Sequence, residues 1–235
     1  MAVPTRRTRP AARTAPVRRT EPKAPALPSA LKEAHLLEHE LAPEARFEGL
    51  AFYDLDLTDS LAEQVEFSQC RFRGARMAES KLPGVRLADC VVEQSDWSNL
   101  RAEQGTMSRV SLAGSRMTGL AWNGGMLRDV AVDDCKLDLT NWRASRFDGV
   151  FMSGSNLTGA DFTDADLRGA TFTGCDLSGA QFSNAKMEGA RFRRCELAGI
   201  GGVTSWRGVV VHPEDLMGLS HVLAKALGIV VEQAP

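Results

Sequence analysis

A five-residue period runs through this chain and constrains its fold more than any other feature. From residue 155 to 199 the sequence divides into SNLTG, ADFTD, ADLRG, ATFTG, CDLSG, AQFSN, AKMEG, ARFRR and CELAG. The third residue of each unit is Leu, Phe or Met, and the first is Ala, Ser or Cys. A period of five fits neither the turn of an α-helix, about 3.6 residues, nor the two-residue alternation of a lone strand. Such a period is typical of a solenoid, in which each repeat buries its apolar side against its neighbours.

The same phase extends back to residue 47 without a slip. All 31 positions at intervals of five from 47 to 197 are apolar, although the chain is only 43% hydrophobic. Nine of the ten Phe and three of the four Trp lie in this phase. Positions two residues earlier are mostly small and include all five Cys: Cys70, Cys90, Cys135, Cys175 and Cys195. No loop therefore interrupts the repeat, and we expect one continuous coil.

These units resemble the A(D/N)LXX consensus of the pentapeptide repeat family over about residues 45–200. ADFTD, ADLRG and CDLSG are nearly ideal matches, whereas the N-terminal half keeps the phase but departs from the consensus letters. The resemblance implies an all-β solenoid, a right-handed quadrilateral β-helix with four pentapeptides per coil and the large apolar residue of each pointing inward. Thirty-one pentapeptides then make nearly eight coils, about 37 Å long at roughly 4.8 Å per layer.

The segments that flank the repeat differ from it in composition. Residues 1–28 contain six Arg, one Lys and six Pro against one acidic residue, and are predicted to be a disordered basic tail. Residues 29–44 are predicted to form a capping helix that begins at Ser29. Residues 201–235 are predicted to form a cap made of a strand, a helix and a short strand over 229–231. Caps are needed because an open coil exposes unpaired strand groups and apolar side chains.

Residue number modulo 20 assigns each pentapeptide to one of four faces. Residues 45–199 contain 22 acidic and 18 basic residues, and a single face carries the whole excess of −4. We call this the acidic face; it includes Leu57, Leu137 and Leu197. Its carboxylates are the candidate partner-binding residues Asp56, Asp59, Glu79, Asp96, Asp138, Asp176 and Glu196.

The resemblance also suggests a partner. The best-known members of the family, of the fluoroquinolone-resistance type, imitate B-DNA and bind type II topoisomerases (DNA gyrase and topoisomerase IV), which they protect from inhibitors. A duplex of this length carries about 22 phosphates, at one per ~1.7 Å. Seven partly neutralised carboxylates carry much less negative charge than these phosphates. Electrostatic complementarity to a DNA-binding groove would therefore be weak unless dimerisation lengthens the acidic face.

Three further contact surfaces are candidates. Val91, Ala131 and Phe151 form an outward apolar strip on another face, which either marks the protein contact of a rigid scaffold or assembly protein or is ordinary surface. The basic tail either binds nucleic acid or another anionic target, or is only solvated. A helix opening at His212 and Pro213 closes the core and, as in the DNA-mimicking relatives, is a candidate homodimer element. Its apolar stripe is Leu216, Leu219, Leu223 and Leu227.

Nothing in the sequence indicates an enzyme. The four His lie outside the repeats, and there is no glycine-rich phosphate loop. The H-x-x-E-H match at His35–His39 lacks a third zinc ligand and a cleft. Stacked Cys are interpreted as small buried fillers. We expect no cofactor, metal or small-molecule substrate. No apolar run approaches the ~18 residues of a membrane span and no signal peptide is visible, so a cytoplasmic protein is predicted.

Overall fold

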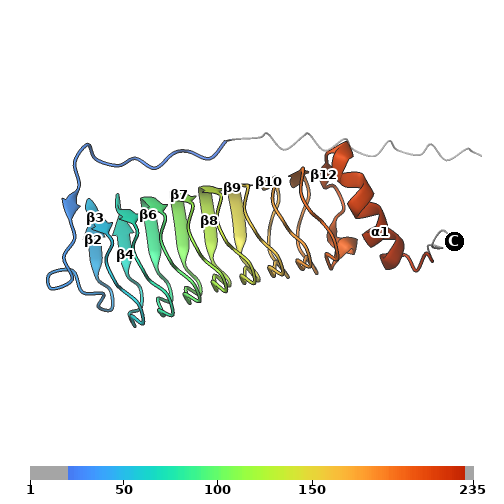
Figure 1. Cartoon of the computed structure of the whole chain (residues 1–235). Coiled ribbons are helices and arrows are strands. Elements are labelled where there is room, and N and C mark those ends of the chain that lie inside the picture. Colours follow the sequence, from blue (N-terminus) through green and yellow to red (C-terminus); the bar gives the residue numbers. More distant parts are fainter. Residues whose placement is uncertain (1–20, 231–235) are drawn as a thin grey trace, which may run out of the picture.

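A computed structural model describes residues 21–230 of the chain. They form a rod in which successive coils stack along one axis, with one helix across the C-terminal end (Figure 1). The strands belong to one twelve-stranded sheet. They are β1 Lys32–Glu33, β2 Arg46–Glu48, β3 Leu50–Tyr53, β4 Glu66–Ser68, β5 Arg71–Arg73, β6 Arg86–Glu93, β7 Thr106–Ala113, β8 Met126–Asp133, β9 Arg146–Ser153, β10 Thr171–Thr173, β11 Arg191–Arg193 and β12 Val210–Val211. The helical elements are η1 Val203–Ser205, η2 Pro213–Asp215 and α1 Leu216–Ala226.

Every strand pairs in parallel with the equivalent strand of the next coil. Partners within the repeat are 20 residues apart, as in the pair Phe52 and Phe72. The spacing is 18 residues where β1 joins β3 and 19 where β11 joins β12. The predicted solenoid with four pentapeptides per coil is therefore confirmed, and β1 and β12 add an incomplete layer at each end.

The four walls of the coil are built differently. The first strand wall contains β2, β4 and the N-terminal halves of β6 to β9, and the second contains β3, β5, the C-terminal halves of β6 to β9, β10 and β11. On the acidic face and the fourth wall, neighbouring coils are joined by single β-bridges, such as Asp56 to Arg76 and Lys81 to Arg101. On each wall, the residues directly before and directly after the inward apolar residue face outward, as do residues 56 and 58 around Leu57.

The inward residues fill the axis as the period predicts. Trp97, Phe147 and Phe182 are buried, and equivalent rings stack from coil to coil, with centroids 4.7 Å apart for Phe52 and Phe72. Trp122 fits because Gly105 and Gly125 leave room for its indole: a Cβ at Gly125 would lie 2.4 Å from the ring. The indole donates a hydrogen bond to the Gly105 carbonyl at 3.0 Å.

The Cys side chains are buried fillers, as predicted. All five are free thiols inside the coil. The Sγ of Cys90, for example, donates to the carbonyl of Phe67 at 3.4 Å. Burial raises the pKa of Cys135, so this thiol stays protonated at neutral pH.

The predicted capping helix over 29–44 is wrong. Residues 32–33 form β1, with Lys32 N donating to Gly49 O at 3.1 Å and Ala34 N donating to Ala51 O at 2.8 Å. A single turn follows, in which His39 N donates to His35 O at 2.9 Å. The open edge of the first coil offers backbone partners that an isolated short helix lacks, so strand pairing prevails over local helix propensity.

Residues 21–28 also differ from the prediction of disorder. Together with residues 29–31 they form an extended strap that returns along the rod from its N-terminal end toward the middle (Figure 1). Ala26 N donates to Asp89 Oδ1 at 3.0 Å, and Lys23 N donates to Asp129 Oδ1 at 3.2 Å. The prolines favour an extended backbone, which suits a chain lying along a straight edge. Residues 1–20 of the predicted tail lie outside the described residues.

The C-terminal cap follows the prediction except at its end. Trp206 stacks on Phe192 with centroids 4.7 Å apart, and Leu219 of α1 is buried against the core. The Asp215 carboxylate accepts hydrogen bonds from the backbone of Arg194 and Cys195, which attaches the cap to the last coil. Residues 229–230 are not a strand, because Ile229 N donates to the helix carbonyl of Ala224 at 2.8 Å. Residue 231 lies outside the described part.

Candidate functional site

The acidic face is a flat wall whose charges are arranged in two groups. One outward row joins layer to layer through Asp56, Arg76, Asp96, Arg116, Lys136, Asn156, Asp176 and Glu196. The two cations Arg116 and Lys136 thus separate an N-terminal group, Asp56, Asp59, Glu79 and Asp96, from a C-terminal group, Asp176 and Glu196. Asp138 lies between them and accepts from Thr118 Oγ1 at 2.9 Å. The face is therefore acidic at both ends and mixed in the middle, which the total of −4 does not reveal.

Several carboxylates of this face are held by the residues that follow them. Asp56, Asp96 and Asp176 each accept from the hydroxyl two residues later, at 2.6 Å in all three cases. The backbone N–H of the same residue also donates to the carboxylate. These hydrogen bonds lower the pKa of Asp56 and of Asp176, so both are ionised and oriented at neutral pH.

Not all of this negative charge is available to a partner. Asp56 also pairs with Arg76 at 2.8 Å within the acidic face. On the first strand wall, charges are paired from layer to layer: Glu66 binds both Arg46 and Arg86, and Arg128 pairs with Asp148. The first strand wall therefore presents acids and bases in pairs, whereas the ends of the acidic face keep an excess of carboxylates.

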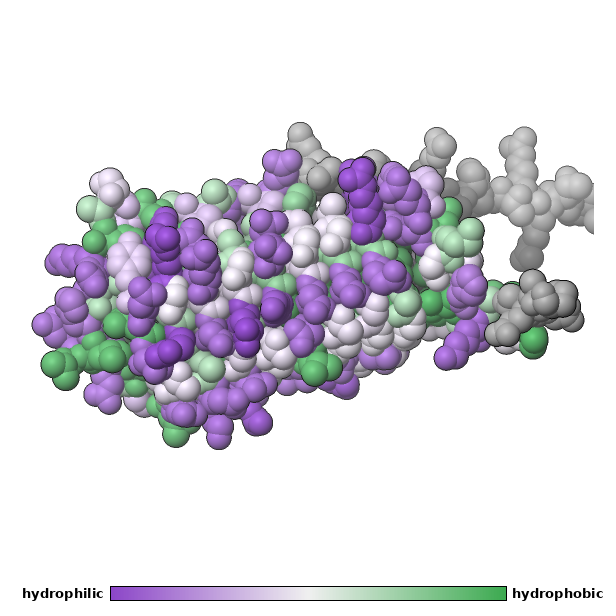
Figure 2. Space-filling model, in the orientation of Figure 1, coloured by the Kyte–Doolittle hydropathy of each residue, from purple (hydrophilic) through white to green (hydrophobic). Residues whose placement is uncertain are grey.

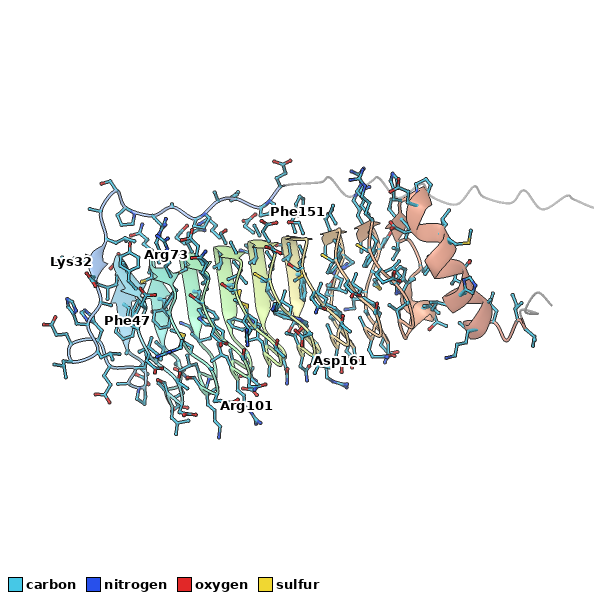
Figure 3. The ribbon with its side chains drawn as sticks, viewed as in Figure 1. Lys32, Phe47, Arg73, Arg101, Phe151 and Asp161 are labelled. Carbon is cyan, nitrogen blue, oxygen red and sulfur yellow. The ribbon has the colours of Figure 1, made fainter. Side chains whose placement is uncertain are left out.

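The apolar strip lies on the second strand wall. Val91, Ala131 and Phe151 stand in one row with Ser111, on the adjacent strands β6 to β9, and each is half-buried. Figure 3 shows Phe151 on the side of the rod along which the strap runs, and Asp161 on the opposite side. A cleft of about 460 Å³ lies on the same wall and is lined by Arg71, Arg73, Glu93, Gln94, Ala113 and Gly114.

The leucine stripe of α1 is divided between core and surface. Leu219 closes the core, whereas Leu216, Leu223 and Leu227 are exposed. Met217 and Ile229 are exposed as well, so the outer side of the cap is apolar. The helical spacing places the four leucines near one side of α1. Which of them is buried depends on how the helix lies against the last coil.

A further surface was missed by sorting residues into faces, because its residues share one end of the rod and only Asp56 and Asp59 among its acids belong to the acidic face. Residues 32–63 contain nine acidic and two basic residues, a net charge of −7, and all nine acidic side chains are exposed. We call this segment the acidic tip. A charge count along the chain, in place of one around the coil, would have found it.

Metal-ligating side chains do not cluster within residues 21–230. In this part of the chain, His, Cys, Asp and Glu side chains nowhere gather in the threes that a metal site needs. His39 of the H-x-x-E-H match accepts a hydrogen bond at Nδ1 from His35 N. Residues 21–230 contain no helix with the length and apolar composition of a membrane span.

Comparisons with known proteins agree with the coil. Two family profiles match, "Pentapeptide repeat region" over residues 126–201 and "Pentapeptide repeats (8 copies)" over residues 52–89. No curated protein sequence matches the chain.

Among solved structures, the chain is similar to QnrB1, a plasmid-mediated fluoroquinolone resistance protein. A trypsin-treated QnrB1 variant is 20% identical with a TM-score of 0.41, covering 87% of this chain and all of that one. Full-length QnrB1 is 19% identical with a TM-score of 0.34, covering 85% and 97%.

HetL, a pentapeptide repeat protein involved in heterocyst differentiation regulation in the cyanobacterium Nostoc, is 18% identical with a TM-score of 0.27, covering 72% and 85%. The two profile matches fall inside the observed coil, whose inward residues recur every five positions from Phe47 onward. The chain is a pentapeptide repeat protein.

Proposed function

We propose that the protein is a non-enzymatic binding module and that the acidic face contacts the DNA-binding groove of a type II topoisomerase, DNA gyrase being the leading candidate. The supporting observation is the set of carboxylates held in fixed orientation on a flat wall by Thr58, Ser98 and Ser178. Preoriented charges lose little side-chain entropy when a basic surface docks on them. This proposal places the protein in the cytoplasm, with its target.

The division of the face predicts how such a contact is made. Asp96 and Asp176 are four layers apart, about 19 Å at the spacing of stacked strands. The two acidic groups therefore suit two separate basic patches better than one continuous duplex-binding groove. Binding is expected to weaken steeply with salt, because exposed charges are screened over about 8 Å at physiological ionic strength.

A supercoiling assay with purified gyrase, with and without a fluoroquinolone, tests this proposal. We expect the protein to alter supercoiling or to restore it in the presence of the inhibitor. Asp96→Asn/Asp176→Asn should weaken that effect about tenfold, since each group loses a carboxylate. Asp133→Asn/Asp164→Asn, which removes two exposed acids from other walls, is the matched control. No effect of the unmodified protein at about tenfold molar excess would exclude gyrase as the partner.

We also propose a two-fold dimer through α1. Leu216, Leu223 and Leu227 remain exposed after the helix has closed the core, and a symmetric contact would cover them. Such a dimer would align two rods end to end and double the length of the acidic face. Light scattering at micromolar concentration should give a dimer, and Leu223→Glu/Leu227→Glu should give a monomer. If the unmodified protein is a monomer, the dimer proposal is overturned, but the proposed contact with topoisomerase is not affected.

A second candidate function is a rigid scaffold that binds another protein through the apolar strip. The observation in its favour is that Val91, Ala131 and Phe151 share one row of the second strand wall, with no charged residue between them. Ala131→Glu should abolish capture of such a partner and leave the gyrase assay unchanged.

The arginines of residues 1–20 are the basis of a third proposal, in which this segment is an arm that binds an anionic target. Deleting residues 1–20 should then remove salt-dependent binding to DNA or to another anionic probe.

A further inference from the structure

The acidic tip combines dense negative charge with exposed leucines. Its nine carboxylates all reach the solvent. Among residues 21–230, ion pairing neutralises only one of them, through Asp56 and Arg76. The full set is Glu33, Glu38, Glu40, Glu44, Glu48, Asp54, Asp56, Asp59 and Glu63. This end of the rod is therefore a strongly anionic surface at neutral pH.

Three leucines lie within this anionic surface. Leu37 is fully exposed at the turn after β1, Leu36 beside it is exposed, and Leu61 is 67% exposed. A cleft of about 290 Å³ is lined by Leu36, Leu41, Leu57 and Leu61 together with Glu40 and Asp56. Figure 2 shows apolar residues gathered at the N-terminal end of the rod, surrounded by polar ones. Apolar and acidic groups thus line one concave site.

The charge of the tip decides among the occupants that could cover these leucines. The apolar cap at the other end does not complement the negative charge of the acidic tip, because residues 203–230 contain two acidic and two basic residues and have no net positive charge. An anionic lipid surface or a nucleic acid would be repelled by the nine carboxylates. A cationic partner with an apolar side meets both requirements, because it buries the leucines and pairs with the carboxylates around them.

The backbone at the tip indicates which form that partner takes. β1 is only two residues long, so an added strand would gain few backbone hydrogen bonds, and its binding would depend on side chains. The short cleft next to a fully exposed leucine suits apolar side chains projecting from one side of a helix at spacings of three and four. We propose that the acidic tip is a docking surface for a basic amphipathic helix of another protein. This surface is separate from α1. It shares Asp56 and Asp59 with the acidic face, but its test does not require the proposed topoisomerase contact.

Binding of a labelled model peptide to the full-length protein tests this proposal by fluorescence anisotropy. The probe is a helix of about 18 residues made of Leu and Lys, with the leucines on one side. A scrambled peptide of the same composition and a Leu/Glu helix of the same pattern are the comparison probes. We expect the Leu/Lys helix to bind at least about tenfold more tightly than either.

Two variants locate the binding site. Leu37→Ser/Leu61→Ser should weaken binding of the Leu/Lys helix about tenfold, and Leu139→Ser should not change it. Leu139 is the matched control because it is 66% exposed but lies in the middle of the rod. Glu38→Gln/Glu40→Gln should weaken binding severalfold and reduce its salt dependence, and Glu188→Gln should do neither. All substituted side chains are exposed, so circular dichroism should show unchanged folding for each variant.

Three outcomes would overturn the proposal. The scrambled peptide could bind as tightly as the helix, which would mean that charge alone attracts it. The leucine variant could bind like the unmodified protein, which would place the peptide elsewhere. Finally, the peptide could fail to bind while light scattering shows oligomers that Leu37→Ser/Leu61→Ser removes, which would make the tip a contact between copies of this chain.

Discussion

The two ends of the rod are closed by different side chains, although each adds a short paired strand. At the C-terminal end, Trp206 and Leu219 place side chains over the last core residues, and the cap of residues 203–230 has balanced charge. At the N-terminal end, the backbone of β1 pairs with the first coil, while Leu36 and Leu37 point away from the core. Both ends pair a short strand with the coil, but only the C-terminal end adds a large aromatic ring and a helix over the core.

This difference shows that the residues that close the end of a solenoid need not be the ones that cover its outer surface. Pairing β1 with β3 uses the unpaired backbone groups of the first coil, and Ala34 and Leu41 cover its core. Neither contact needs Leu36, Leu37 or the nine carboxylates of the acidic tip. The C-terminal cap uses its largest residue for closure and leaves only the outer side of α1 uncovered. The ends are therefore expected to respond differently to substitution.

The largest expected effect is at Trp206. Trp206→Ala should destabilise the protein by about 3–5 kcal/mol, because a large buried ring is lost from the end of the core. Leu37→Ser at the other end should change stability by less than about 0.5 kcal/mol, since Leu37 is fully exposed. Chemical denaturation measures both, and hydrogen exchange should show that the last coils open first in Trp206→Ala. Equal effects at the two positions would contradict the comparison.

A smaller effect separates closure from surface within α1 itself. Leu219→Ala should cost about 2 kcal/mol or more, whereas Leu223→Ala should cost well under 1 kcal/mol in a monomer. Leu219 is buried and Leu223 is exposed on the same helix, so the pair is internally matched. Measuring both at a protein concentration that keeps the chain monomeric avoids any contribution from association. If Leu223→Ala were the more destabilising, α1 would close the coil through a different side.

The next effect tests the strap, which links the N-terminal end to the middle of the rod. Asp89→Asn should weaken the strap by about 1 kcal/mol, because its carboxylate accepts from both Ala26 N and Arg109. Amide exchange at Ala26 and tryptic cleavage at Lys23 should both become faster. Asp134→Asn, at an exposed corner of the same rod, is the control and should leave both unchanged. Unaltered protection of Ala26 in Asp89→Asn would mean that contacts other than the Asp89 carboxylate hold the strap, such as the bond from Lys23 N to Asp129.

The smallest effect is the response of the strap to acid. Hydrogen bonding from Arg109 lowers the pKa of Asp89, with a smaller contribution from Ala26 N. A depressed pKa in the folded state means that the stabilisation is present above the ordinary value of 3.8 and is lost as pH falls through the lowered pKa. NMR should therefore show the Ala26 amide unchanged from pH 7 to about 4.5 and losing protection only below that range. In Asp89→Asn this pH dependence should disappear.

The sequence predicts the coil well because the apolar residue that recurs every five positions is the one that is buried in the core. Inside the coil, a residue at a phase position lies between the residues 20 positions before and 20 positions after it, so the same packing rule applies at each of these positions. The acidic face was likewise predictable as a set of residues. Its division by Arg116 and Lys136 became clear only when the outward row was followed from layer to layer.

The ends and the strap could not be predicted in this way. Residues 29–44 have a helical pattern when considered alone, but the edge of the first coil offers Lys32 and Ala34 better backbone partners. Ala26 and Lys23 bind carboxylates 63 and 106 residues away, contacts that no local period encodes.

The sequence by itself determined that this protein is a solenoid with one large inward residue in every five, because side-chain burial repeats with the chain. Only the tertiary structure decided how the two ends are closed, where the strap lies and which leucines are left exposed. Those outcomes depend on which backbone and carboxylate groups the assembled coil leaves unpaired, and these groups come together only after folding.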